Sequence, residues 1–271
     1  MIRPRPLRTA RLQRAGLIDY VEAWGLQRRL AEEVRAGGPE ALVLCSHPPT
    51  VTLGRRFTPD QLLVPRATLE AAGVRVVETD RGGGATVHNP GQLVGYPILR
   101  LGPAPDLHAL LRGVERVLVS ALREVGIDAA ARDGLTGVWV GDEKIASIGM
   151  RFERGVTLHG FALNVDNDLA LFDSVVACGL PDIRLTSVQR AQSAQPANQQ
   201  ARVQVGESVD LPAAAPAPAI GGGEATRDGS RFEPLERAVV KGFEVGFSLC
   251  FQEVAGVVPP AALHPRDYEL Q

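Results

Sequence analysis

The sequence predicts an α+β domain, and three observations support this prediction. Residues 17–35 and 107–125 carry apolar side chains at helical spacing, and short apolar runs of strand length lie between and after them. These helices and strands are mixed without regular alternation, which favours α+β over a doubly wound parallel sheet. With 271 residues, 45% of them hydrophobic, the chain can bury one large core, so we expect one domain with additions.

The first half of the chain is expected to form one helix and several strands. The helix over 17–35 should stop at Gly37-Gly38-Pro39, because glycine and proline end helices. Strands are predicted over 41–45, 74–78 and 93–99, each an apolar run bounded by turn residues.

In the second half, the helix over 107–125 should end at Gly126, a common residue after a helix C-terminus. Three short strands follow, separated by the turn sequences Gly141-Asp142 and Glu153-Arg154-Gly155; they are predicted over 138–140, 144–150 and 156–165. Apolar residues from Leu235 to Phe251 then indicate one last helix.

Composition divides the chain into three parts. Residues 1–188 are expected to form the main core, and residues 189–234, rich in Ala, Gln, Pro and Gly, a flexible insert or linker. The last part, 235–271, is too short for a separate domain, so we expect its helix to pack on the core.

Charge gives no general reason to expect nucleic acid or a membrane as partner, since the net charge is -2. Arginines do cluster near the N-terminus, at Arg3, Arg5, Arg8, Arg11 and Arg14. A solvated flexible tail is favoured there, with an acidic docking partner as the alternative. The charged start has no apolar run after it, as a secretory signal would, and no stretch approaches the length of a membrane span, so we expect a soluble protein.

The cysteines and histidines argue against structural or catalytic metal. Cys45, Cys178 and Cys250 are odd in number and lack Cys-x-x-Cys spacing, which disfavours a disulfide framework and a zinc site. The five histidines show no metal-binding spacing, so no metal is predicted. A reducing cytoplasm fits this cysteine usage best.

The segment from Arg81 to Gln92, RGGGATVHNPGQ, is the clearest candidate binding element. Successive glycines let a ligand approach the main chain closely, and their amides offer hydrogen bonds to a carbonyl or an anion. A glycine-rich loop alone is a weak signal. It gains weight from Lys144 and Cys178 further along the chain, because a loop, a lysine and a cysteine together suggest covalent acyl chemistry.

Cys178 lies in the turn sequence Ala177-Cys178-Gly179-Leu180-Pro181, where its sulfur could be accessible. A nearby cation would increase its thiolate fraction, and Lys144 could supply that charge. Taken alone, a cysteine is more often a small buried hydrophobe and a lysine a solvated charge. For His88 and for His159, a structural hydrogen-bonding role and a role in the site are about equally favoured.

An ordered series of motifs resembles the lipoyl (octanoyl) transferase family from about Tyr20 to Val188. The matching segments are His47-Pro48-Pro49, Thr52-Leu53-Gly54-Arg55-Arg56, Arg81-Gly82-Gly83, Thr86, His88, Pro90-Gly91-Gln92, Tyr96-Pro97, Thr136-Gly137-Val138-Trp139-Val140, Lys144-Ile145-Ala146, Gly149, His159-Gly160, Ala162-Leu163-Asn164, Phe172, Cys178-Gly179 and Thr186-Ser187-Val188. Asn89 and Ser46 depart from the family pattern, and the insert after Gln189 has no counterpart in it. The resemblance implies a central mixed β-sheet flanked by helices, a fold shared with the biotin and lipoate ligases.

The resemblance also implies residue roles. The cysteine matching Cys178 forms an acyl thioester, and the lysine matching Lys144 lowers its pKa. Tyr96, His159 and Asn164 are supporting candidates. The implied substrate contacts are Arg81, Gly82, Gly83, Gly84, Ala85, Thr86, Val87, His88, Ser147, Ile148, Gly149, Gly160, Phe161 and Ala162.

The implied activity is transfer of an octanoyl group from octanoyl-acyl carrier protein to a lysine of lipoyl domains, without a cofactor. The acceptors would be 2-oxoacid dehydrogenases and the glycine cleavage H protein. One alternative is an ATP-dependent lipoate or biotin ligase, which also uses a glycine-rich loop and a lysine but needs no acylated cysteine. The other is a noncatalytic carrier-binding protein that keeps the fold.

Overall fold

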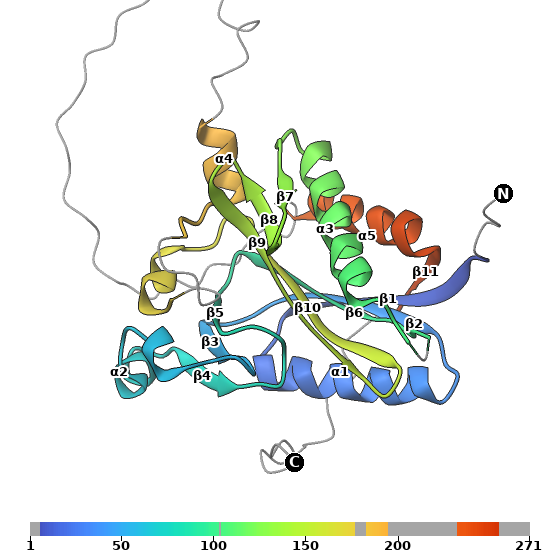
Figure 1. Cartoon of the computed structure of the whole chain (residues 1–271), viewed down its shortest axis with the longest axis horizontal. Coiled ribbons are helices and arrows are strands. Elements are labelled where there is room, and N and C mark those ends of the chain that lie inside the picture. Colours follow the sequence, from blue (N-terminus) through green and yellow to red (C-terminus); the bar gives the residue numbers. More distant parts are fainter. Residues whose placement is uncertain (1–5, 103, 177–182, 195–231, 255–271) are drawn as a thin grey trace, which may run out of the picture.

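The computed structural model describes residues 6–102, 104–176, 183–194 and 232–254 (Figure 1). Its main sheet has eight strands in the order β11-β1-β2-β6-β10-β9-β8-β7. The strands are β1 (Arg8–Leu17), β2 (Glu40–Ser46), β6 (Gln92–Ile98), β7 (Ala130–Arg132), β8 (Leu135–Val140), β9 (Glu143–Glu153), β10 (Val156–Asn164) and β11 (Leu249–Glu253). β1 runs parallel to β2 and β11, whereas the other neighbours are antiparallel. The predicted mixed sheet is confirmed.

A second sheet has three strands in the order β4-β3-β5. β3 (Thr50–Leu53) is parallel to β4 (Arg75–Glu78) and antiparallel to β5 (Ala85–His88). The short helix α2 (Arg66–Ala71) and the 3-10 turns η1 (Pro59–Gln61) and η2 (Ala170–Ser174) lie in the connecting segments. Because β5 follows the glycines directly, this sheet holds one end of the glycine-rich segment.

Helices cover both faces of the main sheet. Successive residues of a strand point to opposite faces, so Leu42 and Leu44 of β2 pack with one set of helices and Val43 with another. Leu42 and Leu44 join α3 (Leu107–Glu124) and α5 (Glu233–Phe247), and Val43 joins α1 (Tyr20–Arg35). Figure 1 shows α3 and α5 on the side of the sheet opposite α1.

The helix starts follow from local sequence. The Asp19 side chain accepts a hydrogen bond from the Val21 amide at 2.8 Å, and Asp106 accepts one from the Ala109 amide at 2.9 Å. An aspartate at this position satisfies an amide that the helix itself leaves unpaired. The two long predicted helices are confirmed within a few residues.

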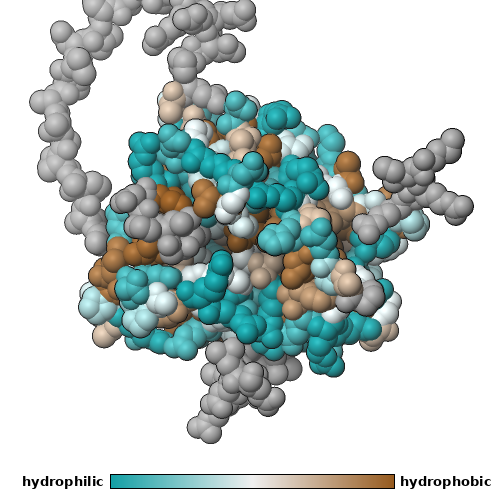
Figure 2. All heavy atoms as spheres, in the orientation of Figure 1, coloured by the Kyte–Doolittle hydropathy of each residue, from teal (hydrophilic) through white to brown (hydrophobic). Residues whose placement is uncertain are grey.

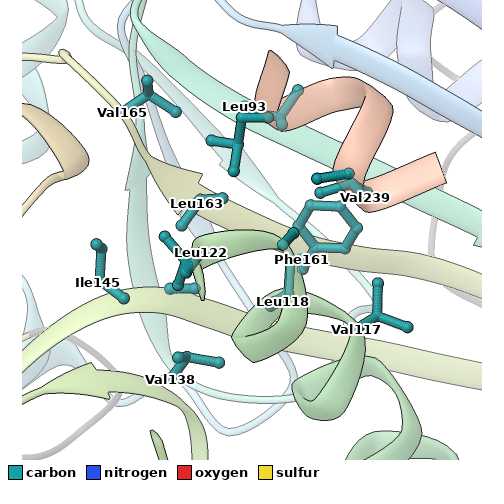
Figure 3. Packing of buried hydrophobic residues seen from close by; sticks show 14 of the residues in the cluster. Leu93, Val117, Leu118, Leu122, Val138, Ile145, Phe161, Leu163, Val165 and Val239 are labelled. Atoms are coloured by element: carbon teal, nitrogen blue, oxygen red, sulfur yellow. The ribbon is translucent and has the colours of Figure 1, made fainter. Parts of the chain in front are cut away.

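Phe161 of β10 lies in the larger core cluster together with Leu118 of α3 and Val239 of α5 (Figure 3). Its ring stacks on Phe243 of α5 with a centroid distance of 6.1 Å. The core thereby joins the strand that borders the candidate site to a helix more than seventy residues later. Figure 2 shows hydrophilic residues over much of the visible surface, in keeping with apolar side chains collected in these clusters.

The expected N-terminal tail is wrong for residues 8–14. These residues form β1, and their arginines pair with glutamates of neighbouring elements: Arg8 with Glu40 at 2.7 Å, Arg11 with Glu33, and Arg14 with Glu236 and Glu253. An isolated arginine-rich sequence resembles a solvated tail, whereas paired charges can be held along a strand. Arg3 and Arg5 lie outside the described residues.

The C-terminal part also differs from its prediction. The last helix ends at Phe247, Ser248 adopts a left-handed backbone with φ 54°, and the chain then forms β11. Cys250 therefore lies on a strand and is exposed, whereas Cys45 is buried. A further helix, α4 (Val188–Ala194), occupies the start of the segment expected to be an insert. The rest of that segment to residue 231 lies outside the described residues.

Candidate functional site

A cavity of about 330 Å³ lies where the glycine-rich segment meets β9 and β10 of the main sheet. All of the expected substrate contacts except Val87 line it. Its wall consists of Tyr20, Arg56, Arg81, Gly82, Gly83, Gly84, Ala85, Thr86, His88, Val94, Tyr96, Gly134, Leu135, Thr136, Lys144, Ser147, Ile148, Gly149, His159, Gly160, Phe161 and Ala162. The volume falls at the lower end of the range for small-molecule sites.

Glycines allow the loop to lie directly on the main sheet. Gly149 pairs with Gly160 across β9 and β10, and the Gly82 amide donates to the Met150 carbonyl at 3.2 Å. A β-carbon at Gly149 would lie 2.8 Å from the Gly82 oxygen, and one at Gly160 would lie 2.0 Å from the Gly95 oxygen. Only glycine fits these close backbone approaches.

Arg81 fastens the loop to the second sheet. Its guanidinium donates to the Thr52 carbonyl at 2.6 Å, to the Thr52 hydroxyl at 2.9 Å and to the Gly84 carbonyl at 2.7 Å. The side chain is buried and lines the cavity. Arg81 therefore organises the loop backbone with charge-assisted hydrogen bonds.

Strand periodicity explains why Val87 is absent from the cavity. Thr86 and His88 line it, whereas Val87 packs into the apolar core beside Val51 of the second sheet. Neighbouring residues of β5 point to opposite faces, so the side chain of Val87 points away from the face that Thr86 and His88 share. Val87 therefore lies outside the cavity wall, and its role as a substrate contact stays a prediction.

His88 takes part in a buried hydrogen-bond chain. Its Nδ1 lies 2.8 Å from Gln92 Oε1, and Gln92 Nε2 donates to Asn164 Oδ1 at 3.0 Å. Asn164 Nδ2 then donates to the Thr186 carbonyl at 3.1 Å. Asn164 therefore supports the site from behind and does not line the cavity. Burial, with a contribution from nearby His47, lowers the pKa of His88 well below its ordinary value.

Tyr96 is positioned by a second buried histidine. Its hydroxyl donates to His47 Nε2 at 2.7 Å, while His47 Nδ1 donates to the Ile18 carbonyl at 2.8 Å. The two bonds assign a neutral imidazole, and burial lowers the pKa of His47 to about 4. Tyr96 therefore presents a fixed aromatic wall to the cavity.

Lys144 is buried at the second position of β9 and lines the cavity. Its Nζ lies 5.2 Å from the centroid of the Trp139 ring, within range of a cation–π interaction. Its amide donates to the Arg184 carbonyl, and its carbonyl accepts from the Thr186 amide. Lys144 is therefore part of the buried cavity wall and not the solvated surface charge that a lysine alone suggests.

Cys178 lies outside the described residues, so its side chain has no assigned position. The described residues on either side of it are anchored near the cavity wall. The Val176 amide donates to the Gln61 carbonyl, and Gln61 Oε1 accepts from the Ala85 amide. On the other side, Thr186 pairs with Lys144.

Asp80, which the sequence did not single out, holds His159 beside the cavity. The two side chains form a buried hydrogen bond of 2.6 Å between Asp80 Oδ1 and His159 Nε2. Burial alone would raise the pKa of Asp80, but the His159 hydrogen bond and the charges of Arg151 and Arg28 lower it overall. An acidic residue at a strand end is usually solvated, so only its position before the loop could have marked it.

Within the part of the chain that the structure describes, no group of three or more His, Cys, Asp or Glu side chains could hold a metal ion. In the same part, no helix is long and apolar enough to cross a membrane.

Comparison with known proteins identifies the family of this chain. A model of the lipoyl protein ligase A/B catalytic domain matches residues 19–208, which include the loop, β9, β10 and Lys144. The chain belongs to the lipoyl protein ligase A/B catalytic-domain family.

Two curated relatives of this chain are octanoyltransferases. An octanoyltransferase of Roseiflexus sp. (strain RS-1) is 48% identical over 187 residues, covering 67% of this chain and 78% of the relative. The octanoyltransferase of Mycobacterium leprae (strain Br4923) is 42% identical over 205 residues, covering 73% and 86%. The resemblance expected from the motifs is confirmed.

Solved structures share the family fold. A lipoate-protein ligase A bound with ATP superposes with a TM-score of 0.66, covering 93% of this chain and 90% of the ligase at 17% sequence identity. A putative lipoate protein ligase from T. acidophilum with bound lipoic acid gives a TM-score of 0.60 at 18% identity, covering 93% and 90%. At these identities the likeness concerns the fold alone.

Proposed function

We propose that this protein is an octanoyltransferase that moves an octanoyl group from octanoyl-acyl carrier protein to a lysine of a lipoyl domain. The observation that carries the proposal is the position of Lys144, buried in the wall of a cavity formed by the glycine loop. The named relatives, octanoyltransferases at 42–48% identity, favour this acyl group.

In the first half of the reaction, the Cys178 thiolate attacks the thioester carbonyl of the acylated carrier. The carbon–sulfur bond to the carrier breaks, the carrier sulfur takes a proton from the Lys144 ammonium and leaves as a thiol, and the octanoyl group remains on Cys178. A cation close to a thiol favours the thiolate, and Lys144 is the buried cation of this wall. The pairing of Thr186 with Lys144 brings the chain after Cys178 to this lysine, which supports the assignment.

Loop amides are the proposed donors to the oxygen of the tetrahedral intermediate. Gly83 and Gly84 line the cavity, and neither amide is a donor in the hydrogen bonds among the described residues. The amides of Gly82 and Ala85 are already used, by Met150 and Gln61. Donors aimed at a developing oxyanion can account for a large part of the acceleration of acyl transfer.

In the second half, the amine of the acceptor lysine attacks the acyl-Cys178 carbonyl. An amide forms, the Cys178–acyl bond breaks, and the amine proton replaces the acyl group on sulfur. Lys144 is the better candidate to carry that proton, because both ring nitrogens of His88 are engaged, Nδ1 with Gln92 and Nε2 with Thr52. The acceptors would be lipoyl domains of 2-oxoacid dehydrogenases and the glycine cleavage H protein.

Intact-mass measurement tests this proposal directly. The protein is incubated with octanoyl-carrier protein without ATP, as wild type and as the Cys178→Ala and Cys250→Ala variants. Wild type and Cys250→Ala should each gain one octanoyl group, and Cys178→Ala should gain none. Cys250→Ala is the matched control because Cys250 is exposed and could react nonspecifically.

Other outcomes identify the competing functions. A Cys178→Ala variant that still modifies a lipoyl domain in the presence of ATP would indicate a ligase that works through an acyl-adenylate. Carrier binding without any acyl adduct on wild type would indicate a noncatalytic binding protein. Either result would overturn the transferase mechanism.

A further inference from the structure

Three elements of the main domain converge on the carboxylate of Asp80. Oδ1 accepts from His159 of β10 at 2.6 Å, and Oδ2 pairs with Arg28 of α1 at 3.0 Å and Arg151 of β9 at 2.9 Å. The Asp80 side chain is about 1% exposed. A buried carboxylate that loses such partners would be left without compensation, so this arrangement is a strong constraint on the chain at Asp80.

The next residue, Arg81, is bound to a different sheet. Its guanidinium binds Thr52 of β3, in the three-stranded sheet. Asp80 and Arg81 therefore hold the start of the glycine loop between α1 and the main sheet on one side and the second sheet on the other. Both anchors lie directly before Gly82, Gly83 and Gly84, whose lack of side chains gives them little conformational restriction of their own.

His159 carries two marks of a specialised role. Its backbone is left-handed, with φ 57°, a conformation that costs free energy for a residue other than glycine. Its amide is held by Gln27 Oε1 at 2.8 Å, and its Nδ1 has no hydrogen-bond partner among the described residues. The hydrogen bonding of the ring is thus directed to Asp80.

We propose that Asp80 and His159 are a positioning pair that fixes the glycine loop over the cavity, so that its amides are in place before substrate binds. This role rests on the proposed acyl transfer, since the loop is taken to bind the acyl donor. Neither side chain is assigned to bond making or bond breaking. Their effect is exerted through the placement of Gly82, Gly83 and Gly84.

The test uses two variants that remove different parts of the pair. Asp80→Asn keeps the size and removes the charge. His159→Gly removes the imidazole and accepts a positive φ, so any defect cannot come from backbone strain at residue 159. The matched control is Glu153→Gln, which removes the other carboxylate paired with Arg151, at 3.0 Å, and leaves Asp80 intact.

The first measurement is single-turnover octanoyl loading as a function of octanoyl-carrier concentration. Each variant loses a hydrogen bond to a charged group. We therefore expect the half-saturating donor concentration to rise, or the loading rate to fall, on the order of 10-fold for both variants. Glu153→Gln should match wild type. If wild type is not loaded at all, the proposed function fails; if wild type is loaded and both variants match it, the positioning role fails.

The second measurement is hydrogen exchange without substrate, which does not depend on activity. Peptides covering residues 79–90 should exchange faster in both variants, while α3 peptides keep the wild-type rate. Unchanged exchange in 79–90 would overturn the proposal. If Asp80→Asn fails to fold, Arg28→Gln replaces it, because Arg28 is the partly exposed outer partner; the same local increase is expected, and its absence would again be decisive.

Discussion

A β-carbon on Gly137 would lie 2.6 Å from Cε of Lys144 and 3.3 Å from its Nζ. Gly137 is thus the residue of β8 that leaves room for the buried lysine of β9. Its amide is held by Glu115 Oε1 of α3 at 3.0 Å, and Glu115 is itself buried. The position of Lys144 therefore depends on a glycine and a buried carboxylate that do not line the cavity.

We expect Gly137→Ala to slow octanoyl loading by about 10-fold or more, because the new methyl displaces the lysine side chain and also meets the Ala146 carbonyl. The measurement is the single-turnover rate of acyl-protein formation at saturating donor. Gly141→Ala serves as the control, since Gly141 also has positive φ, 54°, but a methyl group added there would have no neighbouring atom within 4 Å. If both variants slow loading to the same extent, backbone strain and not displacement of Lys144 is the cause of the slower loading.

Removing the charge of Lys144 should change the pH dependence of loading. Lys144→Met keeps the length of the side chain and its packing against Trp139. A cation stabilises the thiolate, so its loss raises the pKa of the reacting thiol; loading at pH 7 should fall by about 10-fold and recover as pH rises. Rate–pH profiles of wild type and variant measure this. A variant whose rate falls equally at all pH values would exclude the proposed effect on the thiol.

Periodic sequence patterns predicted the central part of the fold. The helices over 17–35 and 107–125 and the strands over 41–45, 93–99 and 156–165 all correspond to observed elements, because burial imposes regular apolar spacing. β1 was missed since three of its residues are arginines whose partners, such as Glu40 and Glu236, are distant in sequence. Pairing of that kind is a tertiary property, which local patterns do not contain.

The candidate site was predictable only in part, because contacts between residues distant in sequence do not appear in local patterns. Motif resemblance named the loop and the β9 and β10 segments, and the fold brings them to one cavity. Asp80 was not identified because its partner His159 lies 79 residues away. The resemblance carried over Val87 with its neighbours, but the alternation of β5 turns its side chain into the core of the second sheet.

Stability should fall as pH decreases from about 6.5 to about 4. His47 is buried and its pKa is lowered to about 4, against an ordinary value of 6.5. In that window the unfolded chain takes up a proton that the folded protein does not, so the folded state loses stability as pH falls. Above pH 6.5 the two states bind the same number of protons, so no stability is lost. The lowered pKa values of His88 and His159 act in the same direction.

The shift of His47 alone corresponds to about 3 kcal/mol when fully developed. The measurement is the free energy of unfolding by urea at pH values from 7.5 to 4, and a His47→Gln variant should show a shallower decline because it lacks this proton uptake. Asp80 acts in a lower window, since its pKa is below the ordinary value of 3.8 and its contribution disappears only as pH falls through it. A wild-type stability that is constant between pH 6.5 and 4.5 would contradict the buried neutral histidines.

Arg56 is the arginine best placed to attract an acidic donor. Its side chain is exposed and lines the cavity, while its amide donates to the Gly83 carbonyl at 3.0 Å, so an exposed charge stands on a fixed backbone. Arg8, Arg11 and Arg14, which the sequence offered for docking an acidic partner, are paired within the fold.

We therefore expect Arg56→Gln to lower kcat/KM for the acylated carrier by about 3- to 10-fold at low salt. The difference from wild type should shrink at high salt, because ions screen exposed charges. Arg237→Gln is the control, as Arg237 is exposed on α5 and pairs with Glu233. If the salt dependence of Arg56→Gln equals that of wild type, the carrier approaches the cavity without help from this residue.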